Sequence, residues 1–420
     1  MNIHVISLAH TQTTRTFEVC AFTSNVRGFC RMMKSLGHSV ILYAGEDNDA
    51  PCDELVTCIT KKAQSVLCRV NGPADVGNAA YNPNAPHWQT FNNSVIAALR
   101  ERAKDGDFLC LISGNCLDPV AREFPNLIRV EFSCGYEGVL KYTHRVFPSY
   151  SWAQAIYTFE NSGRAQGGQA RFYDRVIPHY FDPTDFPFVE KKKPYLAFVG
   201  RLNDDKGYKI AIDVAREIGV KLVVAGMGDT LPLRGIDYRG LVGIKERAEI
   251  MGNAAAVFVP SLYMEPFGKV AVEALLCGTP IITTDFGALS EINEDGVTGY
   301  RCRTRQQFIE AAKECLVGRI HSRICRQHAM KKYSESVIKH QYEAYFEDLQ
   351  ELYQPGHKYL TVPERANMPE NLTVAQPTQM VAIHGPTGGC GKPECPQCNA
   401  SLSIIEQTIM APDGRFMHKD

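Results

Sequence analysis

The sequence predicts an α/β fold of two doubly wound parallel-sheet domains followed by a C-terminal tail. Two observations support this prediction. Apolar strand-like runs alternate with helix-like patterns from the N-terminus and again from Tyr195, and a segment rich in proline and charge, residues 182–194, separates the two series. We place the domains at 1–187 and 188–335, a closing helix at 336–353 and the tail at 354–420.

The elements follow from the hydrophobic periodicity, in chain order. The first series has strands at 3–9, 38–45, 107–113 and 127–133 and helices at Asn25–Leu36 and Trp88–Lys104. The second series has strands starting at Tyr195, Lys221, Gly235 and Ala254, helices at Tyr208–Ile218 and after Pro266, and a long helical pattern from His321 to Leu352. After Tyr353 the periodicity fades, so we expect a tail that is partly disordered or separately folded.

The composition is that of a globular protein. The 420 residues are 45% hydrophobic and 22% charged, and the formal net charge of -1 gives no overall attraction to nucleic acid or anionic membranes. No basic leader or membrane-length apolar run is present, so we predict a cytoplasmic protein without a transmembrane segment. The cysteines lie mostly in apolar segments and should be reduced and buried, for example Cys20, Cys30, Cys110 and Cys277.

The segment between Pro260 and Pro280 carries the strongest functional signal. Glu265 and Glu273 are about two helical turns apart on one face, and Phe267 and Gly268 would open a helix at the carboxyl end of a strand. Free N–H groups and the positive end of the helix dipole would then suit a phosphate. The alternative is an amphipathic helix with two solvated glutamates.

Here the sequence resembles the retaining GT-B glycosyltransferases of the family 4 type, which carry a Glu-x7-Glu motif. The resemblance covers residues 195–302, including the strand ending in Gly200-Arg201-Leu202, and is weak before that range. It implies two Rossmann-like domains facing a cleft, with the closing helix crossing back to the first domain. It also implies front-side transfer of a hexose from a nucleotide diphosphate sugar, by analogy a UDP-sugar, to an acceptor hydroxyl, without a catalytic metal or other cofactor.

The resemblance assigns roles to donor-side residues. Arg201 and Lys206 would stabilise the leaving diphosphate, although a surface ion pair with Asp204 or Asp205 is the alternative. Glu265 would accept hydrogen bonds from sugar hydroxyls and Glu273 from the ribose. The amides of Phe267, Gly268 and Lys269 would hold the diphosphate, and the remaining donor-binding positions are Gly200, Gly226, Gly228 and Val242.

The first domain should bind the acceptor, through polar residues expected just beyond strand ends. The candidates are His10, Thr14, Tyr136, Glu137, His144 and Arg145. Each could equally be a helix cap or a satisfied turn residue. Many relatives have a Gly-Gly pair in the first loop where this chain has His-Thr-Gln-Thr-Thr, so the acceptor class stays open.

Other functions are compatible with the sequence. The acceptor could be a hydroxylated base in phage-type DNA, for which a small cysteine-rich tail would be a plausible accessory. The chain could also be a catalytically silent GT-B binding protein, although the complete set of Arg201, Lys206, Glu265 and Glu273 argues against that. A phosphorylase and a nucleotide-sugar epimerase are the remaining enzyme alternatives.

The tail contains a possible zinc site at His384, Cys390, Cys395 and Cys398. Four such side chains could provide the tetrahedral ligands of structural zinc. Otherwise these cysteines are reduced thiols in a flexible tail.

If the tail binds zinc, protein purified without chelator should contain about one zinc ion per chain, and Cys395→Ser should lose it. Elemental analysis measures both. Protein free of stoichiometric metal would contradict the site, and nucleotide binding should survive the substitution because the donor site lies in another domain.

Overall fold

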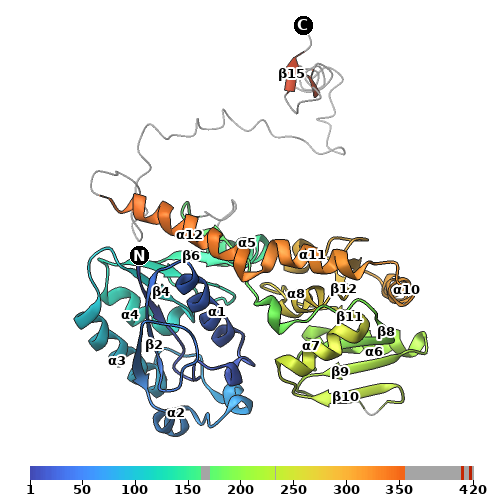
Figure 1. The fold of residues 1–420 in the computed structure, drawn as a ribbon, viewed down its shortest axis with the longest axis horizontal. Helices are drawn as coiled ribbons and strands as arrows, with labels where there is room; N and C mark the ends of the chain where they lie inside the picture. The colour runs from blue at the N-terminus through green and yellow to red at the C-terminus, as the bar shows by residue number, and fades with distance from the viewer. Residues whose placement is uncertain (162–170, 232, 355–407, 411–415, 419–420) are drawn as a thin grey trace, which may run out of the picture. The chain divides into compact units, whose positions relative to one another are not determined.

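The computed structural model describes residues 1–161, 171–231, 233–354, 408–410 and 416–418. The chain forms two compact units, Met1–Glu364 and Arg365–Asp420. The first unit contains two parallel sheets, as the sequence predicts (Figure 1). No helix in the described residues is long and apolar enough to cross a membrane.

The first sheet has seven parallel strands in the order β3-β2-β1-β4-β5-β6-β7. They are β1 (Asn2–Ile6), β2 (Ser39–Gly45), β3 (Glu54–Ile59), β4 (Phe108–Leu111), β5 (Ile128–Glu131), β6 (His144–Phe147) and β7 (Arg175–Val176). The helices between them are α1 (Ala21–Ser35), α2 (Lys61–Cys68), α3 (Pro86–Arg102), α4 (Asp118–Glu123) and α5 (Tyr150–Glu160). The sequence periodicity did not predict β3, β6, β7, α2, α4 or α5, which are short or only partly buried.

The second sheet has six parallel strands in the order β10-β9-β8-β11-β12-β13. They are β8 (Lys193–Val199), β9 (Lys221–Ala225), β10 (Ile236–Gly240), β11 (Ala254–Val259), β12 (Ile281–Thr284) and β13 (Gly299–Cys302). The helices are α6 (Tyr208–Glu217), α7 (Ile244–Asn253), α8 (Lys269–Leu276), α9 (Ala288–Ile292), α10 (Arg305–Leu316) and α11 (Ser322–Tyr333). The strand order reverses between β8 and β11, and open α/β sheets bind ligands beyond the carboxyl ends of the strands at such a switch point.

The long helical pattern from His321 to Leu352 is two helices rather than one. Ser334 is extended and separates α11 from α12 (Glu335–Leu352). The break has a tertiary cause, because Phe181 pairs with this position: its N–H donates to the Tyr333 carbonyl at 3.0 Å, and its own carbonyl accepts from the Glu335 N–H at 2.9 Å. Sequence periodicity does not register such a distant pairing.

The two helices belong to different hydrophobic cores. Cys325 and Ala329 of α11 are buried in the core of the second sheet. Tyr342 and Phe346 of α12 are buried in the core of the first sheet, where the Phe346 ring stacks on Phe108 with centroids 4.5 Å apart. The chain therefore returns to the first domain after completing the second (Figure 1).

The C-terminal unit contains two short antiparallel strands, β14 (Thr408–Met410) and β15 (Phe416–His418). The predicted zinc ligands His384, Cys390, Cys395 and Cys398 lie outside the described residues. The twelve cysteines of the described residues are free thiols, and all but Cys52 are buried, as predicted for Cys20, Cys30, Cys110 and Cys277.

The turn after β9 approaches the turn after β8 so closely that only glycine fits at Gly226. Its φ is 149°, and a Cβ atom there would lie 1.7 Å from the Gly200 carbonyl oxygen.

Gly226→Ala should therefore lower the free energy of unfolding, by about 1–3 kcal/mol beyond any backbone strain. Gly219→Ala is the control, because Gly219 also has a positive φ of 71° but no atom within 4 Å of its hypothetical Cβ. Equal losses in urea unfolding would contradict the close approach.

Candidate functional site

The predicted donor-side residues lie together at the carboxyl ends of β8, β9 and β11. Backbone hydrogen bonds hold the turns that follow these strands. The Gly200 N–H donates to the Ala225 carbonyl at 2.9 Å, and the Leu202 N–H donates to the Met227 carbonyl at 2.8 Å. The Gly226 N–H donates to the Gly240 carbonyl at 2.7 Å. These turns form one connected backbone layer at the switch point of the sheet.

Lys206 and Glu265 form an ion pair at the centre of this region. Lys206 follows β8 in a short 3-10 turn that Asn203 caps, and Glu265 follows β11. The Lys206 ammonium lies 2.5 Å from Oε1 of Glu265 and 2.9 Å from the Tyr263 hydroxyl. The Ser261 hydroxyl donates to Oε1 of Glu265 at 2.7 Å and the Tyr263 hydroxyl donates to Oε2 at 2.9 Å. The Glu265 carboxylate is thus held in one orientation, with one lone pair on Oε2 still free to accept.

Arg201 is exposed at the end of β8, and no carboxylate among the described residues lies within ion-pair distance of it. The alternative of a surface ion pair with its acidic neighbours is not found. Asp204 pairs with Lys209 instead, at 2.6 Å, and the Asp205 carbonyl accepts from the Leu262 N–H. An exposed guanidinium without an ion-pair partner in the described part of the chain is available to an anionic ligand.

Helix α8 begins at Lys269, just after Phe267 and Gly268, the two residues expected to open it. Gly268 is the N-cap, with a φ of 93°, and Lys269 is the first helical residue. No side chain caps this helix, and the Ala271 N–H donates to the Gly268 carbonyl at 3.0 Å, so the N–H groups that precede Ala271 are the ones open to a ligand. Phe267 is buried in the second core and fixes the chain that enters the helix.

Glu273 lies one helical turn further along α8 and is bound by a residue that the sequence analysis missed. Arg247 of α7 donates from Nε to Oε2 of Glu273 at 2.9 Å and from Nη2 to Oε1 at 2.8 Å. Both side chains are largely buried. Two parallel hydrogen bonds between a guanidinium and a carboxylate fix the orientation of the carboxylate. The only hint of this contact in the sequence is that Arg247 is a basic residue soon after Val242, in the segment predicted to contact the nucleobase.

The side chain of Lys269 reaches the first domain. Its ammonium donates to the Ser24 hydroxyl at 3.1 Å and to Oδ1 of Asn25 at 3.0 Å, both on α1. Burial lowers the pKa of Lys269 to about 8, although the Glu273 carboxylate opposes this shift. The residue that starts the donor-side helix therefore also connects the two domains.

Several predicted acceptor-side residues have structural partners. Tyr136 accepts from the Ser113 N–H at 2.9 Å and donates to Glu131 at 2.8 Å. Thr14 precedes a short 3-10 helix and bonds to the Thr16 hydroxyl. Glu137 is exposed.

His10 is fully buried after β1. Its Nε2 lies 3.0 Å from the Tyr81 hydroxyl, whereas Nδ1 has no partner in the described residues. Burial lowers the pKa of His10 to about 3, so the ring is neutral. Tyr81 is half exposed and its ring contacts His10 edge-on, with centroids 4.9 Å apart.

His144 and Arg145 do not lie beyond a strand end as expected. They open strand β6, at the amino end, and both are buried. Arg145 pairs with Asp174 at 2.7 Å and with Glu160 at 2.8 Å, and His144 contacts the Tyr353 hydroxyl. Their partners come from later in the chain, so the local pattern does not indicate that a strand begins there.

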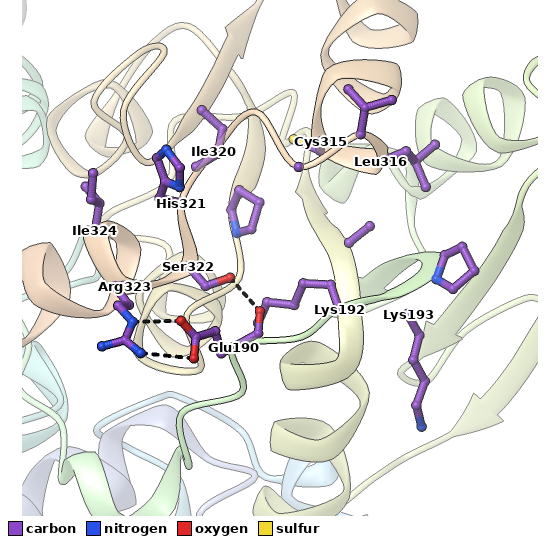
Figure 2. Close-up of a pocket in the computed structure, with 15 residues that line it drawn as sticks. Glu190, Lys192, Lys193, Cys315, Leu316, Ile320, His321, Ser322, Arg323 and Ile324 are labelled. Atoms are coloured by element: carbon purple, nitrogen blue, oxygen red, sulfur yellow. Dashed lines mark hydrogen bonds and ion pairs between the residues drawn. The ribbon is translucent and has the colours of Figure 1, made fainter.

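A pocket of about 620 Å³ lies at the amino ends of β8, β11 and β12, opposite the predicted site (Figure 2). Glu190 faces Arg323 in it, with a Nε–Oε1 distance of 2.7 Å, and its carbonyl accepts from the Ser322 hydroxyl. None of the predicted site residues lines this pocket. No group of three or more metal-ligating side chains suited to a metal ion occurs in the described residues.

Residues 184–334 match the protein family described as Glycosyl transferases group 1. Glycogen synthase of Mycobacterium tuberculosis is 32% identical over 150 residues, which are 31% of this chain and 36% of the relative. D-inositol 3-phosphate glycosyltransferase of Mycobacterium bovis is 34% identical over 161 residues, which are 32% of this chain and 33% of the relative. The chain thus spans about a third of the length of these curated relatives.

Solved structures resemble most of the chain. Sucrose-phosphate synthase from Thermosynechococcus elongatus has a TM-score of 0.61 at 17% identity, covering 83% of this chain and 98% of that one. HepE of Anabaena, solved in complex with UDP and glucose, has a TM-score of 0.54 at 15% identity, covering 82% and 99%. These likenesses concern the fold, and they confirm the predicted GT-B arrangement of two Rossmann-like domains.

Proposed function

We propose that this protein is a retaining glycosyltransferase that moves a hexose from a nucleotide diphosphate sugar to an acceptor hydroxyl. One observation carries the proposal. Within the segment that matches the Glycosyl transferases group 1 family, the Lys206–Glu265 pair, the exposed Arg201 and the start of α8 all follow β8 or β11 at the switch point of the second sheet. Cations, a fixed carboxylate and free amides are the groups that a sugar diphosphate requires.

Different residues would stabilise the leaving diphosphate and bind the sugar during transfer. Negative charge develops on the diphosphate as the anomeric bond breaks, and Arg201, Lys206 and the first-turn amides of α8 stabilise it. Glu265 accepts a hydrogen bond from a sugar hydroxyl through the remaining lone pair of Oε2. In the front-side mechanism the departing phosphate takes the acceptor proton, so no protein base is needed.

The nucleoside would bind further along the same edge. Glu273 accepts from the ribose hydroxyls, and the Arg247 fork keeps its carboxylate oriented while each oxygen retains a second lone pair. Backbone groups around Val242 contact the base. UDP is the first donor nucleotide to test, because HepE was solved with UDP and glucose.

The first domain favours an acceptor without a polyanionic backbone. Two of its cations near the carboxyl edge of the sheet are paired, Arg27 with Glu18 and Asp49 and Lys61 with Asp47, whereas Lys62 is exposed. These pairs reduce the positive charge available to phosphates, which dominate the affinity of proteins for DNA. We therefore rank DNA below a neutral hydroxylated acceptor.

The reduced cysteines fit the expected cytoplasmic location.

A nucleotide diphosphate should stabilise the protein in the presence of chelator, because side-chain cations and helix amides neutralise the phosphates. At about 100 times its dissociation constant, a ligand adds nearly 3 kcal/mol to the free energy of unfolding. Thermal shift with UDP and other nucleoside diphosphates, each with and without EDTA, measures this. Stabilisation that disappears in EDTA would contradict a metal-independent site.

Glu265→Gln and Lys206→Met should each lower kcat about a hundredfold, because both groups act as charge develops in the transition state. Glu273→Gln should mainly raise the KM for the donor. Lys209→Met is the matched control, since Lys209 is an exposed neighbour paired with Asp204. If the first two variants fold and turn over normally, the assignment of the site is wrong.

A further inference from the structure

His179 lies where the end of β7, helix α1 and the segment before α8 meet. The proposed mechanism gives this residue no role. His179 follows β7 and is 6% exposed. Its Nδ1 lies 3.4 Å from Nδ2 of Asn25 on α1, and its ring contacts Phe267 edge-on, with centroids 4.9 Å apart. Phe267 directly precedes the start of α8. His179 is therefore placed beside the proposed diphosphate site by both domains.

The hydrogen bonds of Asn25 define which nitrogen of His179 carries the proton. The Lys269 ammonium can only donate, so the Asn25 atom 3.0 Å from it is the oxygen Oδ1. The Asn25 NH₂ group then points at Nδ1 of His179, which must accept. The neutral imidazole consequently carries its proton on Nε2. The Tyr180 hydroxyl donates to the Asn25 carbonyl at 2.6 Å and fixes the backbone of α1 at the same place.

No hydrogen bond joins the Nε2–H group to another described residue, and Nε2 is not among the fully buried polar atoms without a partner, so a ligand can reach it. It faces Gly135 of the loop after β5, where a Cβ atom would lie 4.0 Å from Nε2 and 3.6 Å from Pro266. The absence of a side chain at Gly135 leaves space next to this donor. Burial and the Lys269 charge lower the pKa of His179 well below its usual range, so the ring stays neutral at physiological pH.

We propose that His179 is a substrate-contacting residue whose Nε2–H donates to an oxygen of the bound nucleotide sugar, on either the diphosphate or the transferred sugar. Asn25 and Lys269 are positioning residues that set the tautomer of His179. This inference rests on the proposed function, because it takes the start of α8 as the place where the donor binds.

His179→Gln and His179→Phe separate this role from simple packing. Glutamine presents an N–H close to the position of Nε2, whereas phenylalanine keeps the volume and has no donor. With UDP-glucose as the probe, we expect His179→Phe to lose about tenfold in affinity or in donor hydrolysis, and His179→Gln to stay within about threefold of the native protein. Equal behaviour of the two variants, whether both intact or both impaired with lowered Tm, would overturn the proposal.

Titration with UDP alone identifies the oxygen. Weaker UDP binding by His179→Phe would place the contact on the diphosphate, and unchanged UDP binding with weaker UDP-glucose binding would place it on the sugar. The native protein is the reference for the proposed function itself. If it binds neither UDP nor any other nucleoside diphosphate, that function fails. If it binds them and the His179 variants match it, only this inference fails.

The tautomer can be tested without any ligand. Long-range ¹H–¹⁵N spectra of histidine-labelled protein should show His179 protonated on Nε2 alone, with its signals assigned by their loss in His179→Gln. Asn25→Asp replaces the donor to Nδ1 by an acceptor of the same shape, so Nδ1 should gain a proton. A native His179 protonated on Nδ1 alone, or an unchanged tautomer in Asn25→Asp, would contradict the arrangement.

Discussion

The partly buried contact between Lys206 and Glu265 constrains the whole donor-side edge. It joins the turn after β8 to the loop after β11, the two strands at which the sheet order reverses. Backbone packing reinforces it: the Leu262 N–H donates to the Asp205 carbonyl at 2.7 Å, and a Cβ on Gly207 would lie 2.1 Å from the Pro260 carbonyl oxygen. Removing two charges from water is costly, so a pair in this position contributes more to orientation than to stability.

The two domains are tied together at more than one place, and this determines where a substrate can be held. Helix α12 completes the first core after the chain has built the second domain. Arg31 of α1 pairs with Glu335, where α12 begins, and Ser149 donates to the Pro266 carbonyl at 2.7 Å. Because Pro266 precedes the start of α8, the first domain contacts the donor-side helix through the same few residues that would meet the nucleotide sugar.

Features formed by residues close together in the sequence could be predicted, whereas contacts between residues far apart in the sequence could not. Strands β8 to β11 and helices α6 and α8 of the second domain could be predicted because their apolar periodicity is local. The Glu265 and Glu273 pair stood out because both residues share one segment. Contacts from distant elements could not be predicted: Arg247 with Glu273, 26 residues apart, and Asn25 with His179, 154 residues apart. The break at Ser334 and the burial of Arg145 were missed for the same reason.

The most direct test of the account is a crystal structure of the protein with UDP. We expect the β-phosphate to lie within hydrogen-bond distance of the first-turn amides of α8 and of Arg201 or Lys206, with the ribose hydroxyls on Glu273. UDP bound in the pocket at the amino ends of β8 and β11, or a diphosphate contacting none of these groups, would contradict the central claim that this edge of the second domain is the donor site.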